Sequence, residues 1–274
     1  MSAQAIGCGP VPGAAPPGAL ENTLMTPQDH GAAVAAETAR FVAAVRDADP
    51  ALPVPDCPDW TLADLVRHAG SVQRWFTVLI RQRIQERPLG RDVDLRLPER
   101  PEQLPDWLAE AAEQAAAAFA EGDLDAPMWA WGADQHVRFW IRRMLFETLV
   151  HRVDAERALG LTPEIDPELA ADGVDEFLTN LPFAAPFAPG TAELRAEDRT
   201  VRFARTDGEG DWLVRLRPDG FGLDTGDAAA DATVRAGAAE LLLLLYGRLD
   251  RTAAGVELAG DQELLAHWFA HSAF

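Results

Sequence analysis

The chain has 274 residues, a formal net charge of -20 at pH 7 and two cysteines, Cys8 and Cys57. This length exceeds the usual size of one domain and predicts two compact units. The acidic balance argues against a nucleic-acid-binding surface, which needs clustered positive charge. Two cysteines are too few for a disulfide framework and suit a reducing compartment.

The N-terminal segment, residues 1–27, contains many small residues and several prolines. It lacks the basic start and the continuous apolar run of a signal peptide, so we expect a disordered tail. The longest purely apolar run, residues 241–246, is far shorter than the roughly 20 residues that a membrane helix requires. We therefore expect a cytoplasmic protein with no membrane-spanning segment.

Residues 28–160 predict a four-helix bundle. Apolar residues recur with a helical period in about 27–48, 61–86, 106–121 and 136–159. Thr61, followed three residues later by Asp64, predicts a capping box at the second helix, and Gly160 is a natural end for the fourth. Bundles of this kind commonly build metal sites from side chains on facing helices.

Residues 161–274 predict a smaller α/β domain. A helix over about 167–181 precedes alternating segments at 200–205, 212–217, 220–224 and 231–236. The pairs Asp207-Gly208 and Asp219-Gly220 are hairpin signals, so we expect a small antiparallel sheet. Helices over 238–249 and 261–271, with a short strand at 255–258 between them, complete the domain. The fold class predicted for the chain is therefore α+β.

Three residues form a candidate metal site. Glu147 and His151 are four residues apart on the fourth helix, so their Cβ atoms should lie about 5 to 6 Å apart on one face. His68 lies on an apolar stripe of the second helix that should face the bundle interior. Two imidazoles and a carboxylate suit a catalytic zinc with an open position, and also iron or manganese. The alternative is a surface ion pair and a hydrogen-bonded core histidine.

Two further polar residues are candidates for supporting roles. Asp154 follows His151 by three residues and could orient its imidazole, as metal-bound histidines usually require. Pairing with Arg152 or Arg157 is the alternative. Arg248 follows the apolar helix, where its guanidinium could hold a carboxylate with two hydrogen bonds or simply cap the helix.

The remaining histidines and Cys57 favour structural roles. His267 and His271 are four residues apart but have no acidic third ligand nearby, so they are expected to complement the dipole of the last helix. His30 and His136 lie at helix starts and are expected to be exposed, with a position at the mouth of a pocket as the alternative. Cys57 lies between prolines, and nothing near it in sequence would lower its pKa, so packing is favoured over nucleophilic chemistry.

Aromatic residues are concentrated in the first domain. Residues 127–132 form a loop-like segment whose tryptophans could cover a pocket. Large aromatic side chains are most often part of a core, and we expect this for most of the following residues. They are Trp60, Trp75, Trp129, Trp131 and Trp140.

Two segments resemble a known family. The run Val54-Pro-Asp-Cys-Pro-Asp-Trp-Thr-Leu-Ala-Asp-Leu-Val-Arg-His68 resembles the signature of the mycothiol-dependent maleylpyruvate isomerase family. The run Glu147-Thr-Leu-Val-His-Arg-Val-Asp-Ala-Glu156 is similar to the family's second metal-ligand segment, at the expected distance along the chain. The resemblance implies a DinB-like four-helix bundle joined to a smaller α/β domain related to sterol-carrier folds.

The resemblance also implies an activity and its residues. His68, Glu147 and His151 would be the ligands of Zn2+ or another divalent metal, and Arg248 the arginine that the second domain contributes to catalysis. Mycothiol would be the thiol cofactor or co-substrate, activated because the metal lowers its pKa. The thiolate would then isomerise a cis double bond or be transferred to a small electrophile, in a monomer or homodimer.

Two other functions remain open. In a thiol-independent hydrolase, a metal-bound water of lowered pKa would replace the thiol on the same ligands. A non-enzymatic small-molecule-binding module would use the zinc structurally, and a fourth protein ligand would favour that function. The sequence offers three candidate protein ligands.

Overall fold

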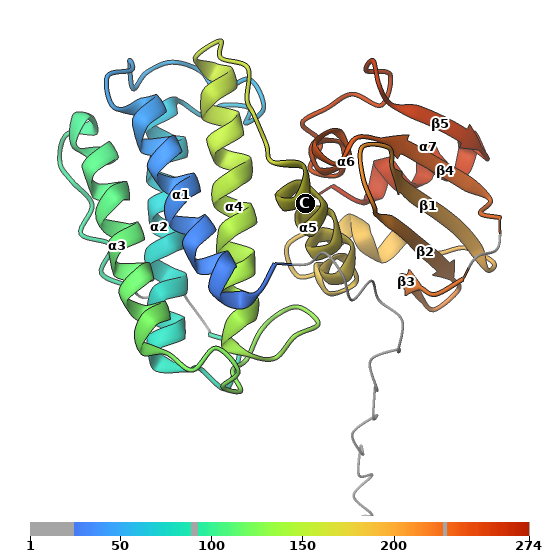
Figure 1. Ribbon diagram of the computed structural model, residues 1–274, viewed down its shortest axis with the longest axis horizontal. Helices are drawn as coiled ribbons and strands as arrows, with labels where there is room; N and C mark the ends of the chain where they lie inside the picture. Colours follow the sequence, from blue (N-terminus) through green and yellow to red (C-terminus); the bar gives the residue numbers. More distant parts are fainter. Residues whose placement is uncertain (1–24, 89–92, 227–228, 274) are drawn as a thin grey trace, which may run out of the picture.

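The computed structural model describes residues 25–88, 93–226 and 229–273. A helical bundle and an α+β unit lie side by side, with α5 between them (Figure 1). Of the expected disordered tail, residues 1–24, including Cys8, lie outside the described residues. Thr26 belongs to the bundle, because its side chain forms a capping box with Asp29 at the start of α1.

The bundle consists of α1 (Pro27–Val45), α2 (Leu62–Gln82), α3 (Leu104–Glu121) and α4 (Val137–Ala158). The predicted capping box of α2 is present, since Thr61 and Asp64 each accept a hydrogen bond from the other's backbone N–H. α2 ends four residues before the predicted end, where Arg83 adopts a left-handed conformation with φ 45°. The four expected helices are confirmed.

α4 is the central helix of the molecule. It packs against α1 and α2 on one side and against α5 on the other. Charged residues on it are therefore buried and need partners, because an unpaired buried charge is costly. Arg152, for example, is fully buried and donates hydrogen bonds to Glu37 (2.8 Å) and Glu156 (2.6 Å). Such pairs fix the rotation of α4 about its axis.

The second unit begins with α5 and is built on one sheet. Its helices and strands are α5 (Pro167–Asn180), β1 (Arg199–Arg205), β2 (Asp211–Arg217), β3 (Gly220–Asp224), β4 (Ala232–Ala236), α6 (Ala238–Leu245), β5 (Glu257–Gly260) and α7 (Gln262–His271). Short 3-10 helices occur at Pro101–Gln103, Leu181–Phe183 and Pro189–Glu193. The predicted α+β class is confirmed.

The sheet departs from expectation in one pairing. Its strand order is β3-β2-β1-β4-β5, and β4 runs parallel to β1, whereas the other three pairs are antiparallel. The sheet is therefore mixed, not purely antiparallel. Both predicted hairpin turns are present, one between β1 and β2 and the other between β2 and β3. Neither lies between β3 and β4. After β3, the carbonyl of Gly226 accepts a hydrogen bond from Arg202 of β1.

One apolar core runs through both units. Phe146 of α4, Phe177 of α5 and Phe203 of β1 are all fully buried and belong to the same cluster. Gly173 allows the close approach, because a Cβ there would lie 2.8 Å from the Phe146 ring and 2.9 Å from Leu242 of α6. The two units are packed as a single body.

α6 ends at Leu245, four residues earlier than predicted. Gly247 takes a left-handed conformation with φ 70°, and the N–H groups of Gly247 and Arg248 donate to the carbonyls of Leu244 and Leu243. Glycine adopts this conformation without steric cost. The turn directs Arg248 back toward α4. Among the described helices, none is long and apolar enough to cross a membrane.

Candidate functional site

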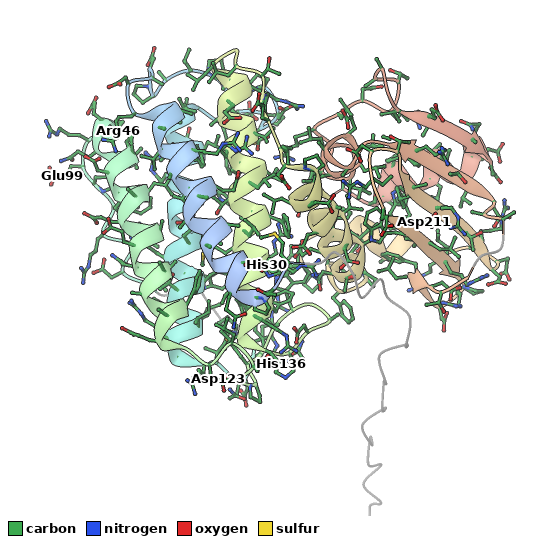
Figure 2. The ribbon with its side chains drawn as sticks, viewed as in Figure 1. His30, Arg46, Glu99, Asp123, His136 and Asp211 are labelled. Atoms are coloured by element: carbon green, nitrogen blue, oxygen red, sulfur yellow. The ribbon has the colours of Figure 1, made fainter. Side chains whose placement is uncertain are left out.

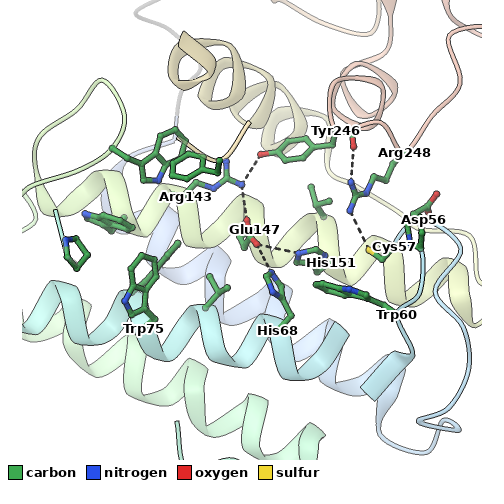
Figure 3. Close-up of a pocket in the computed structure, with 18 of the residues that line it drawn as sticks. Asp56, Cys57, Trp60, His68, Trp75, Arg143, Glu147, His151, Tyr246 and Arg248 are labelled. Atoms are coloured by element: carbon green, nitrogen blue, oxygen red, sulfur yellow. Dashed lines mark hydrogen bonds and ion pairs between the residues drawn. The ribbon is translucent and has the colours of Figure 1, made fainter. Parts of the chain in front are cut away.

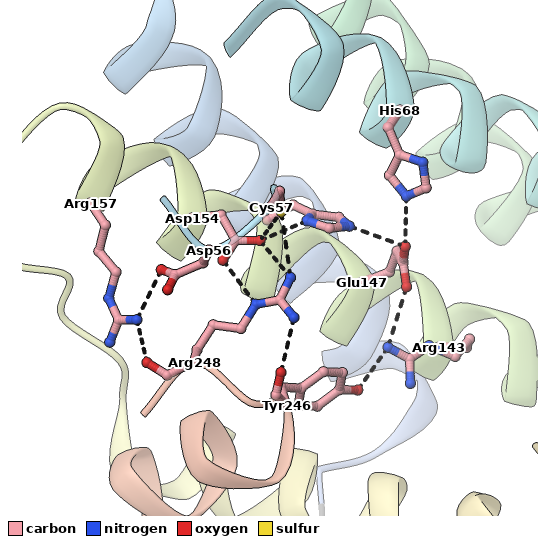
Figure 4. Close-up of polar contacts among 10 residues, drawn as sticks. Asp56, Cys57, His68, Arg143, Glu147, Asp154, Arg157, Tyr246 and Arg248 are labelled. Atoms are coloured by element: carbon pink, nitrogen blue, oxygen red, sulfur yellow. Dashed lines mark hydrogen bonds and ion pairs between the residues drawn. The ribbon is translucent and has the colours of Figure 1, made fainter. Parts of the chain in front are cut away.

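The structure brings His68, Glu147 and His151 together. Glu147 Oε1 lies 3.0 Å from His68 Nε2 and 3.3 Å from His151 Nε2. One ligand atom from each residue fits within 4.8 Å of the others. Figure 4 shows the Glu147 carboxylate pointing toward His68. This group, here called the triad, combines α2 with two positions of α4 that are one helical turn apart.

Local sequence determines how the triad is held. The capping box fixes where α2 begins, and the preceding loop is closed by the Val54 N–H donating to the Trp60 carbonyl (3.0 Å). This places the Trp60 ring against both imidazoles, with ring centroids 5.0 Å from His68 and 6.2 Å from His151. Trp60 therefore packs on the histidines and is only half-buried itself.

Asp154 contacts the other nitrogen of His151. His151 Nδ1 donates to Asp154 Oδ2 at 2.9 Å, which leaves Nε2 facing Glu147. Asp154 is fully buried. The alternative pairings do not occur, because Arg152 binds Glu37 and Arg157 binds Asp56 (3.0 Å). The carboxylate is thus placed to orient the imidazole.

Arg248 also binds Asp154. Its Nε and Nη2 atoms donate to the two carboxylate oxygens at 3.1 and 3.0 Å, and Nη1 donates to the Tyr246 carbonyl at 2.9 Å. Nη2 also lies 3.6 Å from Cys57 Sγ, which is 3.4 Å from Asp154. A guanidinium has five N–H groups, so most of them contact the protein. Arg248 therefore donates two hydrogen bonds to Asp154, and its positive charge lies beside the triad.

Arg143, Tyr246 and Glu176 are site residues that sequence reasoning missed. Arg143 Nη2 lies 3.6 Å from Glu147 Oε2 and donates to the Tyr246 hydroxyl at 2.8 Å. Arg143 Nη1 donates to the fully buried Glu176 at 2.7 Å. The position of Arg143 four residues before Glu147 was a usable signal. Its contacts with the second unit were not visible in the sequence.

The surroundings shift the pKa values of the site. Burial alone would raise the pKa of Glu147, but hydrogen bonds from His151 and His68 hold it well below its usual value. Burial alone would lower the pKa of His151, but hydrogen bonds to Asp154, Cys57 and Glu147 raise it well above its usual value. Against the effect of burial, His151 and Arg248 lower the pKa of Asp154 to about 2. Both carboxylates are therefore ionised at neutral pH.

The triad lies on the wall of a cavity of about 660 Å³ between the two units. Figure 3 shows Trp75 to one side of the triad and Arg248 to the other. The expectation that the 127–132 loop covers a pocket agrees with this lining. The lining residues are Asp56, Cys57, Pro58, Trp60, His68, Val72, Trp75, Phe76, Arg87, Pro88, Trp129, Trp131, Trp140, Arg143, Glu147, Val150, His151, Phe187, Tyr246 and Arg248.

The other histidines lie outside this cavity. The His267 and His271 rings pack at a centroid distance of 4.8 Å with their planes tilted by 56°, and His267 contacts the Glu193 carbonyl. His136 is half-buried and bonded to Asp134 (2.5 Å). His30, labelled in Figure 2, was expected to be exposed, but it is buried, because Asp172 of α5 lies 2.6 Å from its Nε2 atom.

Cys57 is buried, as a packing role requires, but it is not isolated from chemistry. With His151 and Asp154 it forms a second group of closely spaced potential metal ligands. These partners are far from Cys57 along the chain, which is why the sequence near the cysteine gave no sign of them. Arg248 lies beside this group and opposes a cation there.

Two family models together match most of the chain. The model of the mycothiol maleylpyruvate isomerase N-terminal domain matches residues 32–156, and that of the MDMPI C-terminal domain matches residues 168–267. No curated protein matches.

Two solved structures have the same fold. They are the mycothiol-dependent maleylpyruvate isomerase and a mutant of it, with TM-scores of 0.59 and 0.60 at 12% and 11% identity. Each alignment covers 86% of this chain and 93% of the other. With both of its domains matched in order, the chain belongs to the mycothiol maleylpyruvate isomerase family.

Proposed function

We propose that the protein is a metal-dependent enzyme that uses mycothiol as a cofactor or co-substrate. It would act on a small electrophile, either by cis-trans isomerisation or by S-transfer. The observation that carries the proposal is the position of the triad, on the wall of a cavity that both family domains line. Membership of the family supports the thiol, and the donor set supports the metal.

The triad fits a divalent metal. It supplies two imidazole nitrogens and one carboxylate oxygen within 4.8 Å of one another, a set that zinc accepts and that suits iron and manganese as well. Asp154 would fix the orientation of His151, and Arg143 that of Glu147. A bound metal with three protein ligands supplies Lewis acidity that lowers the pKa of an incoming thiol.

Residues around the triad would stabilise charge on the substrate. Arg143 and Arg248 place positive charge on two sides of the triad, where it would stabilise negative charge developing on a substrate carbonyl or carboxylate. Asp154 holds the Arg248 side chain in place through both carboxylate oxygens. Trp60 covers the imidazoles and limits the access of water to them.

The test combines metal analysis with turnover. Wild type, His151→Ala and the control His267→Ala would be analysed for bound metal and assayed with maleylpyruvate and with electrophiles, each with and without mycothiol. We expect metal and thiol-dependent turnover in wild type and in the control, and loss of both in His151→Ala. Full metal occupancy in His151→Ala would refute the ligand assignment.

The same assays separate the competing functions. Turnover that does not need mycothiol would refute the thiol mechanism and favour the hydrolase. If wild type binds the metal but turns over none of these substrates, with or without mycothiol, the result would instead favour a binding module with a structural ion.

A further inference from the structure

The cavity has two chemically different ends. On α2, His68 and Trp75 are seven residues apart, and on α4 the same spacing separates Glu147 from Trp140. Seven residues are two helical turns, or about 10 Å. The Trp75 and Trp140 ring centroids are 5.8 Å apart, so the two antiparallel stripes meet again at their far ends.

The far end, here called the aromatic end, is made of Trp75, Trp129, Trp131 and Phe187. Trp131 of the loop before α4 packs edge-on against Phe187 of the second unit at 5.0 Å. Phe187 is 52% exposed although it is a large apolar residue, and the three tryptophans are only half-buried. Partly exposed rings on several sides of a cavity form a surface on which a flat apolar group can stack.

Charge is distributed unevenly over the described lining residues. The triad itself is titratable, the charged residues Arg143 and Arg248 lie beside it, and Arg143 is matched by Glu147 and Glu176. The aromatic end has one charged residue in the described lining, Arg87, which follows α2 and is exposed. A substrate carboxylate placed among these rings would lose its hydration without gaining a buried ion-pair partner.

We infer that the aromatic end binds a planar, apolar ring system of the electrophilic substrate. The inference rests on the proposed function and narrows its substrate class. The physiological electrophile would carry an aromatic or fused ring about 10 Å, two helical turns, from the carbon that meets the thiol. A short dicarboxylate would reach the triad but leave this end of the cavity unused. The volume of about 660 Å³ lies within the usual range for pockets that enclose a ligand of that size.

An electrophile whose ring lies away from its reactive carbon reproduces the expected chemistry. In N-(2-(2-naphthyl)ethyl)-2-bromoacetamide, a short amide chain separates the ring from the electrophilic carbon. The mycothiol sulfur forms a bond to that carbon, the carbon–bromine bond breaks, bromide leaves with the electron pair, and the thiol proton passes to the buffer. The unreactive 1,3-dinitrobenzene provides a probe of binding alone, measured by calorimetry.

Two exposed phenylalanines give a matched pair of variants. Phe187 lines the cavity, whereas Phe183, 46% exposed, does not. For Phe187→Ala we expect about a tenfold loss in kcat/KM for the naphthyl bromoacetamide and a similar loss in dinitrobenzene affinity, with Phe183→Ala unchanged. Trp75→Leu should behave like Phe187→Ala. In the control Phe183→Ala, maleylpyruvate turnover and the KM for mycothiol should stay within about twofold of wild type.

The outcomes separate the two proposals. Equal effects of Phe187→Ala and Phe183→Ala, or a raised KM for mycothiol with turnover of the naphthyl bromoacetamide unaffected, would overturn the inference. If wild type binds dinitrobenzene and Phe187→Ala does not, but no electrophile reacts with mycothiol, the ring site stands and the proposed function fails. If maleylpyruvate is turned over with mycothiol but dinitrobenzene does not bind, the function stands and the ring site fails.

Discussion

Replacing Asp154 by Asn tests how the site is held together. Asn keeps the size of the side chain but removes the charge that receives His151 and Arg248. The pKa of Asp154 is lowered from 3.8 to about 2, and each pKa unit corresponds to about 1.4 kcal/mol, so roughly 2 kcal/mol of stability depends on this charge. Because the pKa is depressed in the fold, this stability is present above pH 4 and is lost as the pH falls toward 2.

The assay is urea unfolding of wild type, Asp154→Asn and the control Asp219→Asn at neutral and acidic pH. Asp219 is exposed in the β2–β3 turn, where Asn is equally suitable. We expect about 2 kcal/mol lost at pH 7 and a smaller difference near pH 2.5, together with a 10- to 100-fold weaker metal affinity, roughly the usual effect of losing such a partner. Unchanged stability and unchanged metal affinity in Asp154→Asn would refute this account of the carboxylate.

Three further predictions follow from the same contacts. Gly247→Ala places a side chain at φ 70°, so thermal unfolding should show about 1 kcal/mol of destabilisation. Its kcat should also fall, because Arg248 shifts, and an unchanged kcat would contradict this. Arg143→Met leaves Glu176 buried without its cation, so urea unfolding should show a loss of roughly 3 kcal/mol, and a loss below about 1 kcal/mol would speak against it. The pKa of His151 is raised above its ordinary 6.5, so zinc must displace its proton. Titration in weak buffer at pH 7 should release protons, with affinity rising with pH, and His151→Ala should release fewer.

Much of the local structure was predictable because its causes are local. The Thr61 and Asp64 capping box, the helical periods and the two hairpin turns depend on residues within a few positions of one another. The parallel pairing of β1 with β4 joins strands that are separated along the chain by β2 and β3, so it has no local cause. Gly247 was visible in the sequence as a helix stop, although the predicted helix was continued past it.

The site was predictable only in part. The spacing of Glu147 and His151 indicated a shared helix face, but their approach to His68 spans 79 positions and was expected chiefly from the family resemblance. The contact of Asp154 with Arg248 spans 94 positions, and that of Arg143 with Tyr246 spans 103. Both depend on how the two units pack, which no periodicity encodes.

The shared core has a consequence for how the molecule unfolds and evolves. Since Phe146, Phe177 and Phe203 belong to one buried cluster, separating the two halves would expose apolar surface on both. The protein should therefore melt in one cooperative transition, unlike a pair of domains on a flexible tether. The cavity lies between the two units. If the second unit were exchanged for that of a relative, the new unit would have to preserve the α4–α5 contact before it could change which substrates the cavity accepts.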